Sequence, residues 1–207
     1  MEKDNEQLEA LQDIRKMMKE SSKFLSLSGL SGIIAGIYAL AGAYIVHSMV
    51  NEWNRDYLPS GDQYDLTFRI GMVGAAVLIL SIATAYILSA RKAKKIHQRL
   101  FDHTSKKVFW SMVIPLTAGG VFCFALFYHG LFLMISPSML LFYGLALLNS
   151  SKYTLSEIKY LALLQISLGL VASFLPAHGL LFWALGFGVL HIIYGAIVWN
   201  KYDRNIS

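Results

Sequence analysis

Six long apolar stretches alternate with short polar segments along the 207 residues of the chain. A hydrocarbon core about 30 Å thick requires about 20 residues of helix for each crossing, and each stretch approaches or exceeds that length. The pattern therefore predicts an all-α, polytopic membrane protein with six transmembrane helices. The predicted spans are residues 24–49, 65–90, 108–128, 131–149, 158–175 and 180–199.

Lys and Arg are distributed unevenly over the polar segments. If the chain crosses the membrane six times, successive polar segments lie on opposite sides. Of the 18 basic residues, only Arg55 and Arg69 lie in or beside the segments on one side, and all the others lie on the other side. Basic residues are retained on the cytoplasmic side of membrane proteins. We therefore expect three in-out-in hairpins with both termini cytoplasmic, in a plasma membrane or a bacterial inner membrane.

Composition narrows the class of protein. Hydrophobic residues make up 56% of the chain, which is more than soluble domains usually contain, and the short connections leave no room for a separate soluble catalytic domain. The net charge of +5 is concentrated beside predicted membrane ends, so it indicates anionic lipid rather than nucleic acid as the partner. The single Cys123 excludes an intrachain disulfide. No cofactor and no removable signal peptide are predicted.

Two segments are predicted to lie along the membrane surface, an N-terminal helix of mixed charge and a strongly basic connection. Residues 1–23 form a cytoplasmic amphipathic helix in which Leu8, Leu11 and Ile14 share one face, while residues 200–207 form a cytoplasmic tail. The connection between the second and third spans has the pattern of a surface helix against anionic headgroups. Its basic residues are Arg91, Lys92, Lys94, Lys95, Arg99, Lys106 and Lys107.

Small residues and tight turns predict how the helices pack. The first span carries a stripe at small-xxx-small spacing, which lets another helix backbone approach closely. The turns at His129-Gly130 and at residues 176–179 are short enough to force antiparallel neighbours. Similar residues recur around these two turns, which fits either a threefold hairpin repeat or the ordinary recurrence of aromatic residues and Lys at membrane ends. The residues of the packing stripe are Ser28, Gly32, Gly36 and Ala43.

Helix ends and prolines add two local expectations. Asp65 and Arg69 are four residues apart at the outer end of the second span, so they can form an ion pair on one helix face. Pro115 and Pro137 fall within predicted spans and are expected to bend them.

His191 is the one ionisable residue deep within a predicted span, and Gln165 lies at the same depth on the preceding span. Together with Thr117 they are a candidate polar site near the middle of the membrane. The pair could handle a proton or a substrate, or could simply hydrogen-bond and hold two helices together. The second interpretation is favoured because no acidic partner lies within any span. Haem ligation is not favoured, because His191 lacks a histidine at matching depth.

Three further histidines, His47, His129 and His178, fall at the outer ends of spans, one from each predicted hairpin. They could bind a metal or sense external pH, with Asp62 or Asp65 as further ligands. They could equally be ordinary interfacial residues, since the sequence lacks the close ligand spacing typical of zinc sites.

The string Gly29-Leu30-Ser31-Gly32 resembles the G-x-S-G string around the serine of rhomboid proteases. The resemblance covers four residues and would imply an intramembrane protease with Ser31 as nucleophile. Helix packing is the favoured interpretation of these small residues. The chain has no Walker-type loop, no dinucleotide fingerprint and no paired intramembrane carboxylates, which argues against ATP use and against carboxylate-based proton coupling.

Two functions remain. The first is a small channel or transporter for an ion or small solute, in which Gln165, His191 and Thr117 would line a hydrated cavity. The alternative is a non-catalytic sensor or scaffold subunit that acts through its amphipathic N-terminal helix and basic inner loop. Either protein would contact anionic lipid headgroups and could form a homo-oligomer or bind a partner membrane protein, and an enzyme is not favoured.

Overall fold

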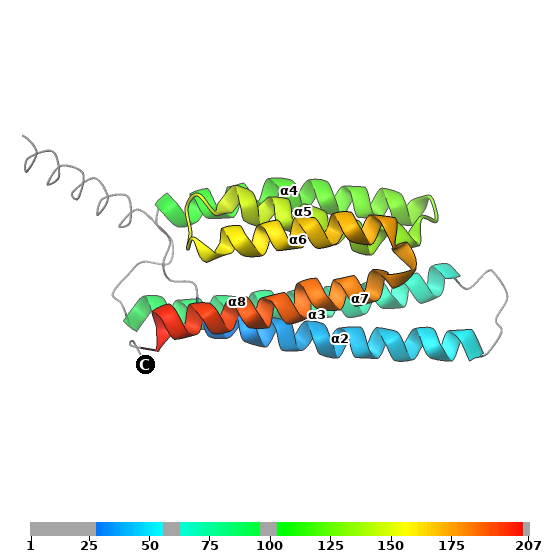
Figure 1. Ribbon diagram of the computed structural model, residues 1–207, viewed down its shortest axis with the longest axis horizontal. Helices are drawn as coiled ribbons and strands as arrows, with labels where there is room; N and C mark the ends of the chain where they lie inside the picture. Colours follow the sequence, from blue (N-terminus) through cyan, green and yellow to red (C-terminus); the bar gives the residue numbers. More distant parts are fainter. Residues whose placement is uncertain (1–27, 56–62, 96–102, 205–207) are drawn as a thin grey trace, which may run out of the picture.

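The computed structural model describes residues 28–55, 63–95 and 103–204, and these residues are helical apart from short turns (Figure 1). Six helices are long and apolar enough to cross a membrane. The prediction of an all-α fold with six helices able to span a membrane is therefore confirmed. The predicted helix within residues 1–23, and Arg99 of the basic connection, lie outside the described residues.

Four of the six spans are single helices, and the other two contain further helical segments. The first three are α2 (Gly29–Arg55), α3 (Gln63–Lys95) and α4 (His103–Tyr128). The fourth and fifth are η1 (Phe132–Met134) with α5 (Ile135–Ser150), and α6 (Glu157–Phe174). The sixth comprises η2 (Pro176–His178), α7 (Gly179–Trp183), the π-helical η3 (Ala184–Leu190), α8 (His191–Val198) and the π-helical η4 (Trp199–Asp203).

The helices form two groups along the long axis of the molecule (Figure 1). In the α5 group, α5 packs against both α4 and α6, around a core of Leu147, Ile158, Leu161 and Ala162. In the α2 group, α2 packs against α3, η3 and α8. The two groups meet where α5 and α6 contact the sixth span.

The third predicted hairpin differs from expectation. The short turn at residues 176–178 is present, but beyond it the sixth span leaves α6 and lies beside α2 (Figure 1). The cause is a close approach between glycines. A Cβ placed on Gly36 would lie 2.6 Å from the carbonyl oxygen of Gly188, and one on Gly32 would lie 3.1 Å from the Cα of Gly195. The described helices therefore form two three-helix groups rather than three similar hairpins.

The packing stripe predicted on the first span faces this contact along much of its length. Gly32 and Gly36 lie against α8 and η3, and Ala43 is buried. Ser28 precedes the helix, and its hydroxyl hydrogen-bonds Asp203 of η4 at 3.3 Å.

The predicted surface helix between the second and third spans is not a separate element. Residues 91–95 continue α3, and residues 103–107 begin α4. The sequence from Ser89 to Lys95 contains no Gly or Pro, and Lys, Arg and Ala are good helix formers, so the helix extends beyond the apolar stretch. Lys92, predicted to contact lipid headgroups, is instead buried.

The two prolines occupy different positions in their helices. Pro115 lies inside α4, as predicted. Pro137 lies in the first turn of α5, where the missing N–H would have no partner within the helix, so it begins this α-helix rather than interrupting it.

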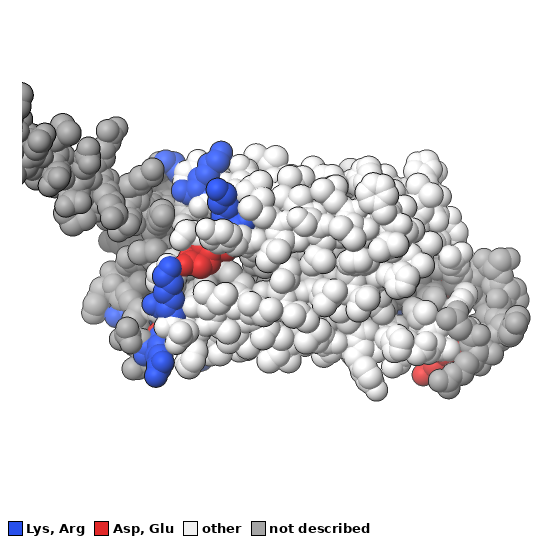
Figure 2. All heavy atoms as spheres, in the orientation of Figure 1, with Lys and Arg blue, Asp and Glu red and all other residues white. Residues whose placement is uncertain are grey.

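Charge separates the two ends of the bundle. Figure 2 shows Lys and Arg gathered at the end where α8 finishes, beside a broad surface without charges. We call this the basic end. Asp65 and Arg69 lie near the start of α3, toward the other end, and pair at 2.8 Å with both side chains more than half exposed. The basic side chains on described residues at the basic end are Arg91, Lys92, Lys94, Lys95, Lys106, Lys107, Lys152, Lys159, Lys201 and Arg204.

Candidate functional site

His191 makes two hydrogen bonds inside the bundle. Its Nδ1 lies 2.9 Å from the carbonyl oxygen of Gly186, and its Nε2 lies 2.8 Å from the hydroxyl of Tyr143 on α5. A carbonyl oxygen can only accept, so Nδ1 carries the proton, and Nε2 of the neutral ring accepts from Tyr143. Both nitrogens of a neutral imidazole are therefore satisfied by protein groups.

Gln165 lies beside His191, as its predicted depth suggested, but the two side chains do not bond directly. The Gln165 amide donates instead to the same Gly186 carbonyl, at 2.8 Å. One backbone oxygen thus accepts from two helices. Gly186 belongs to the π-helical segment η3, and a Cβ there would lie 2.6 Å from Oε1 of Gln165. A Cβ at this position would press against the side chains of Gln165 and Leu140, so one or both of them would have to shift.

Aromatic rings surround the histidine. Phe187 stacks on His191 with ring centroids 6.0 Å apart, and Tyr143 and Trp183 lie within 5.3 Å of the Phe187 ring centroid. These rings come from α5 and from the sixth span, so the cluster lies where the two helix groups meet. We refer to Tyr143, Gln165, Gly186, Phe187 and His191 as the histidine cluster.

Thr117 is not part of the histidine cluster. It is exposed on α4, whereas Gln165 is fully buried and His191 is 8% exposed. The expectation that these three residues line one cavity is therefore wrong for Thr117.

The three outer histidines have separate neighbours. The His47 Nε2 accepts from the Asn51 amide at 3.0 Å, and the His129 ring packs edge-on against Tyr128. His178 lies in the turn η2. Within the described residues no group of three or more His, Cys, Asp or Glu side chains could hold a metal, and Asp62 lies outside them.

Among the described residues, the Ser31 hydroxyl makes no hydrogen bond with a histidine. The side chain is buried and donates to the Ser28 carbonyl at 2.6 Å. The Ser28 carbonyl at the start of α2 therefore accepts from both the hydroxyl and the backbone N–H of Ser31, and this contact does not activate the hydroxyl as a nucleophile.

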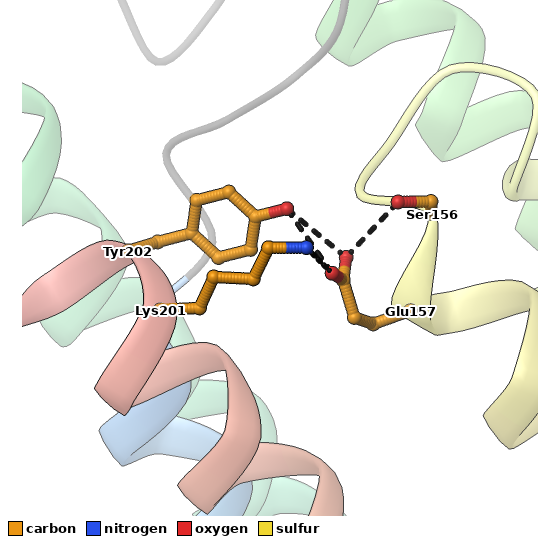
Figure 3. A network of polar contacts seen from close by, with 4 residues as sticks. All are labelled: Ser156, Glu157, Lys201 and Tyr202. Carbon is orange, nitrogen blue, oxygen red and sulfur yellow. Dashed lines mark hydrogen bonds and ion pairs between the residues drawn. The ribbon is translucent and has the colours of Figure 1, made fainter.

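Two polar contacts at the basic end were not expected from the sequence. Asp203 accepts from the Gly29 backbone N–H at 2.7 Å and pairs with Lys92 at 2.6 Å, so one carboxylate joins α2, α3 and η4. On the other side, Glu157 of α6 pairs with Lys201 at 2.5 Å and accepts from the Tyr202 hydroxyl at 3.1 Å (Figure 3).

The two contacts have different roles in the fold. The Asp203 contact closes the α2 group on itself, whereas the Glu157 contact ties the α5 group to the end of the sixth span. Only a weak signal could have revealed them: Lys201-Tyr202-Asp203 follows the last apolar stretch, and Glu157 and Asp203 are the only acidic residues that the structure describes at this end.

Replacing Tyr143 with Phe tests the histidine cluster. The variant leaves Nε2 of His191 without its donor, and we expect a loss of about 1 kcal/mol in the free energy of unfolding. A double-mutant cycle with His191→Phe, measured by unfolding in increasing dodecyl sulfate, should give a coupling energy of about 0.6 kcal/mol. Additive losses would show that the hydrogen bond contributes nothing.

The chain matches no protein-family model, no curated protein and no solved structure. The chemistry available to the histidine cluster therefore follows from its own side chains. The cluster contains an imidazole hydrogen-bonded to a phenol, and an amide that shares the Gly186 carbonyl with the imidazole, without a carboxylate or an activated nucleophile among its members.

Proposed function

We propose that this protein is a non-catalytic membrane subunit, acting as a sensor or scaffold for a partner. The observation that carries the proposal is that the polar side chains deepest in the bundle are buried and hydrogen-bonded to the protein itself. Gln165 is 0% exposed and His191 8% exposed, and both are hydrogen-bonded to protein groups. A side chain that binds a permeating solute must exchange its hydrogen bonds to the protein for hydrogen bonds to the solute. Buried hydrogen bonds between helices instead hold the helices together.

The outer surface of the bundle also supports a partner-binding role. In the most apolar window of α3, none of the residues is buried, although α3 packs against α2. Much of this long helix is therefore available to lipid or to another membrane protein.

The test is partner capture with and without the N-terminal segment. The full chain and a chain lacking residues 1–22 are crosslinked in cells, purified and compared by quantitative mass spectrometry. We expect at least one protein to be recovered in near-stoichiometric amount with the full chain and lost from the truncated one, while both melt at the same temperature. Identical partner sets would contradict the proposal.

A small-solute transporter is the second candidate, and one atom favours it. The Oε1 of Gln165 is buried and has no hydrogen-bond donor among the described residues. A polar solute or water could donate to it. In proteoliposomes, uptake of glycerol or urea that is abolished by Gln165→Leu would support transport and would contradict the subunit proposal.

We further propose that the basic end faces the cytoplasm, in a plasma membrane or a bacterial inner membrane, because basic flanks are retained on that side. Single cysteines test this in a Cys123→Ala background. A membrane-impermeant maleimide should label Glu52→Cys in intact cells and Lys94→Cys only after permeabilisation. Labelling of both from the same side would refute the arrangement.

A further inference from the structure

A surface depression lies at the basic end, between the start of α2, the end of α3 and the end of the sixth span. Three of the side chains around it are cationic and one is a carboxylate, so it carries excess positive charge. The other residues are a serine, a leucine and a tryptophan. The lining residues are Ser28, Leu30, Arg91, Lys92, Lys95, Trp199 and Asp203.

The cations around this depression have different partners. Lys92 is buried and pairs with Asp203, which also caps the first N–H of α2. Arg91 and Lys95 are exposed, and no described carboxylate forms an ion pair with either of them. They are four residues apart on α3 and therefore project from one face of the helix. Two cations with the spacing to grip one anion thus remain at the rim.

Apolar side chains lead from the depression toward the middle of the membrane. Leu30 lines it, and Ile37 and Tyr44 follow at seven-residue spacing on the same face of α2, all of them exposed. Trp199 lies at the same end, and tryptophan favours the headgroup level of a bilayer. An anion held by Arg91 and Lys95 would therefore have an apolar path beside it.

We propose that this depression binds the headgroup of one anionic phospholipid, with Arg91 and Lys95 contacting the phosphate. The acyl chains lie along the apolar face of α2 that contains Ile37. This is a defined site for a single lipid rather than a general attraction to charge, and it is independent of whether the protein is a subunit or a transporter. A free phosphate ester has the same phosphate chemistry as the headgroup but has no acyl chains to pack against the apolar face.

Native mass spectrometry of the full chain in neutral detergent tests the proposal. The probes are phosphatidylglycerol, phosphatidylcholine with the same acyl chains, and glycerol 3-phosphate. We expect the first phosphatidylglycerol to bind more tightly than phosphatidylcholine. The Arg91→Ala/Lys95→Ala variant should bind it about thirtyfold more weakly, the factor for two basic groups at their typical contribution beside anionic lipid.

The matched control is Lys94→Ala/Lys106→Ala, which removes the same charge from exposed positions outside the depression. It should retain the preference for phosphatidylglycerol. Equal loss in both double variants, or equal binding of the two lipids by the wild type, would overturn the proposal. Displacement of the lipid by glycerol 3-phosphate would overturn the assignment to a lipid. If the alanine variant fails to fold, Arg91→Gln/Lys95→Gln removes the charge while keeping polar side chains of substantial length.

Discussion

Replacing Asp203 with Ala should destabilise the folded protein by at least 3 kcal/mol, since removing one member of a buried ion pair costs about 3–5 kcal/mol. The Asp203 and Lys92 side chains are only 11% and 9% exposed, and they pair at 2.6 Å. The substitution leaves a buried ammonium without this carboxylate and also removes the acceptor for the Gly29 N–H at the start of α2. Unfolding in increasing dodecyl sulfate, followed by far-ultraviolet circular dichroism, measures the loss.

The matched control is Asp65→Ala, which breaks the ion pair with Arg69. Those side chains are 57% and 61% exposed, and an exposed pair contributes about 0–1 kcal/mol. The double variant Lys92→Met/Asp203→Ala should recover part of the stability, because it removes the charge that the single variant leaves buried. If Asp203→Ala and Asp65→Ala gave equal losses, the buried pair would have no special role in closing the α2 group.

The six spans could be predicted because the cost of exposing backbone polar groups to lipid leaves a long apolar helix as the main solution. Helix ends were less predictable. The charges of Arg91–Lys95 predict the end of the second span and a separate surface helix. Helix propensity does not stop at the membrane boundary, and α3 continues to Lys95.

The histidine cluster could be predicted only in part. Counting residues from the turn at Pro176 placed His191 and Gln165 at one depth, and the structure places them side by side on one carbonyl. That carbonyl belongs to a π-helical segment, which has no compositional signature. The position of Thr117 could not be predicted, because α4 is apolar on most of its surface and its sequence does not reveal which face turns inward.

The spacing of the glycines in the sixth span indicates which helix it packs against. Gly188 and Gly195 are seven residues apart, as are Gly29 and Gly36 on the first span, and each pair occupies one helix face. Two such faces permit closer contact with each other than with the larger side chains of α6. The short loop between the fifth and sixth spans predicts that these two helices pack as a hairpin. Loop length shows only that two helices are close along the chain, and it does not show which helix surfaces are complementary.

Replacing Gly195 with Ala should therefore open the contact between α2 and α8. The added Cβ would lie 2.5 Å from the Ile33 nitrogen and 2.6 Å from the Gly29 carbonyl oxygen, and both are backbone atoms that cannot rotate away. The helices must move apart, and overpacking of this kind costs about 1–3 kcal/mol, with larger losses when backbone must shift.

Gly74→Ala on α3 is the control for the effect of alanine itself. A Cβ at Gly74 meets nothing within 4 Å, so the substitution should stabilise the helix by up to about 1 kcal/mol through its better propensity. The two variants make the same chemical change and are expected to shift the dodecyl sulfate midpoint in opposite directions. A Gly195→Ala protein as stable as the Gly74→Ala protein would show that α2 and α8 do not pack through their glycines, and the two-group arrangement of the bundle would then be wrong.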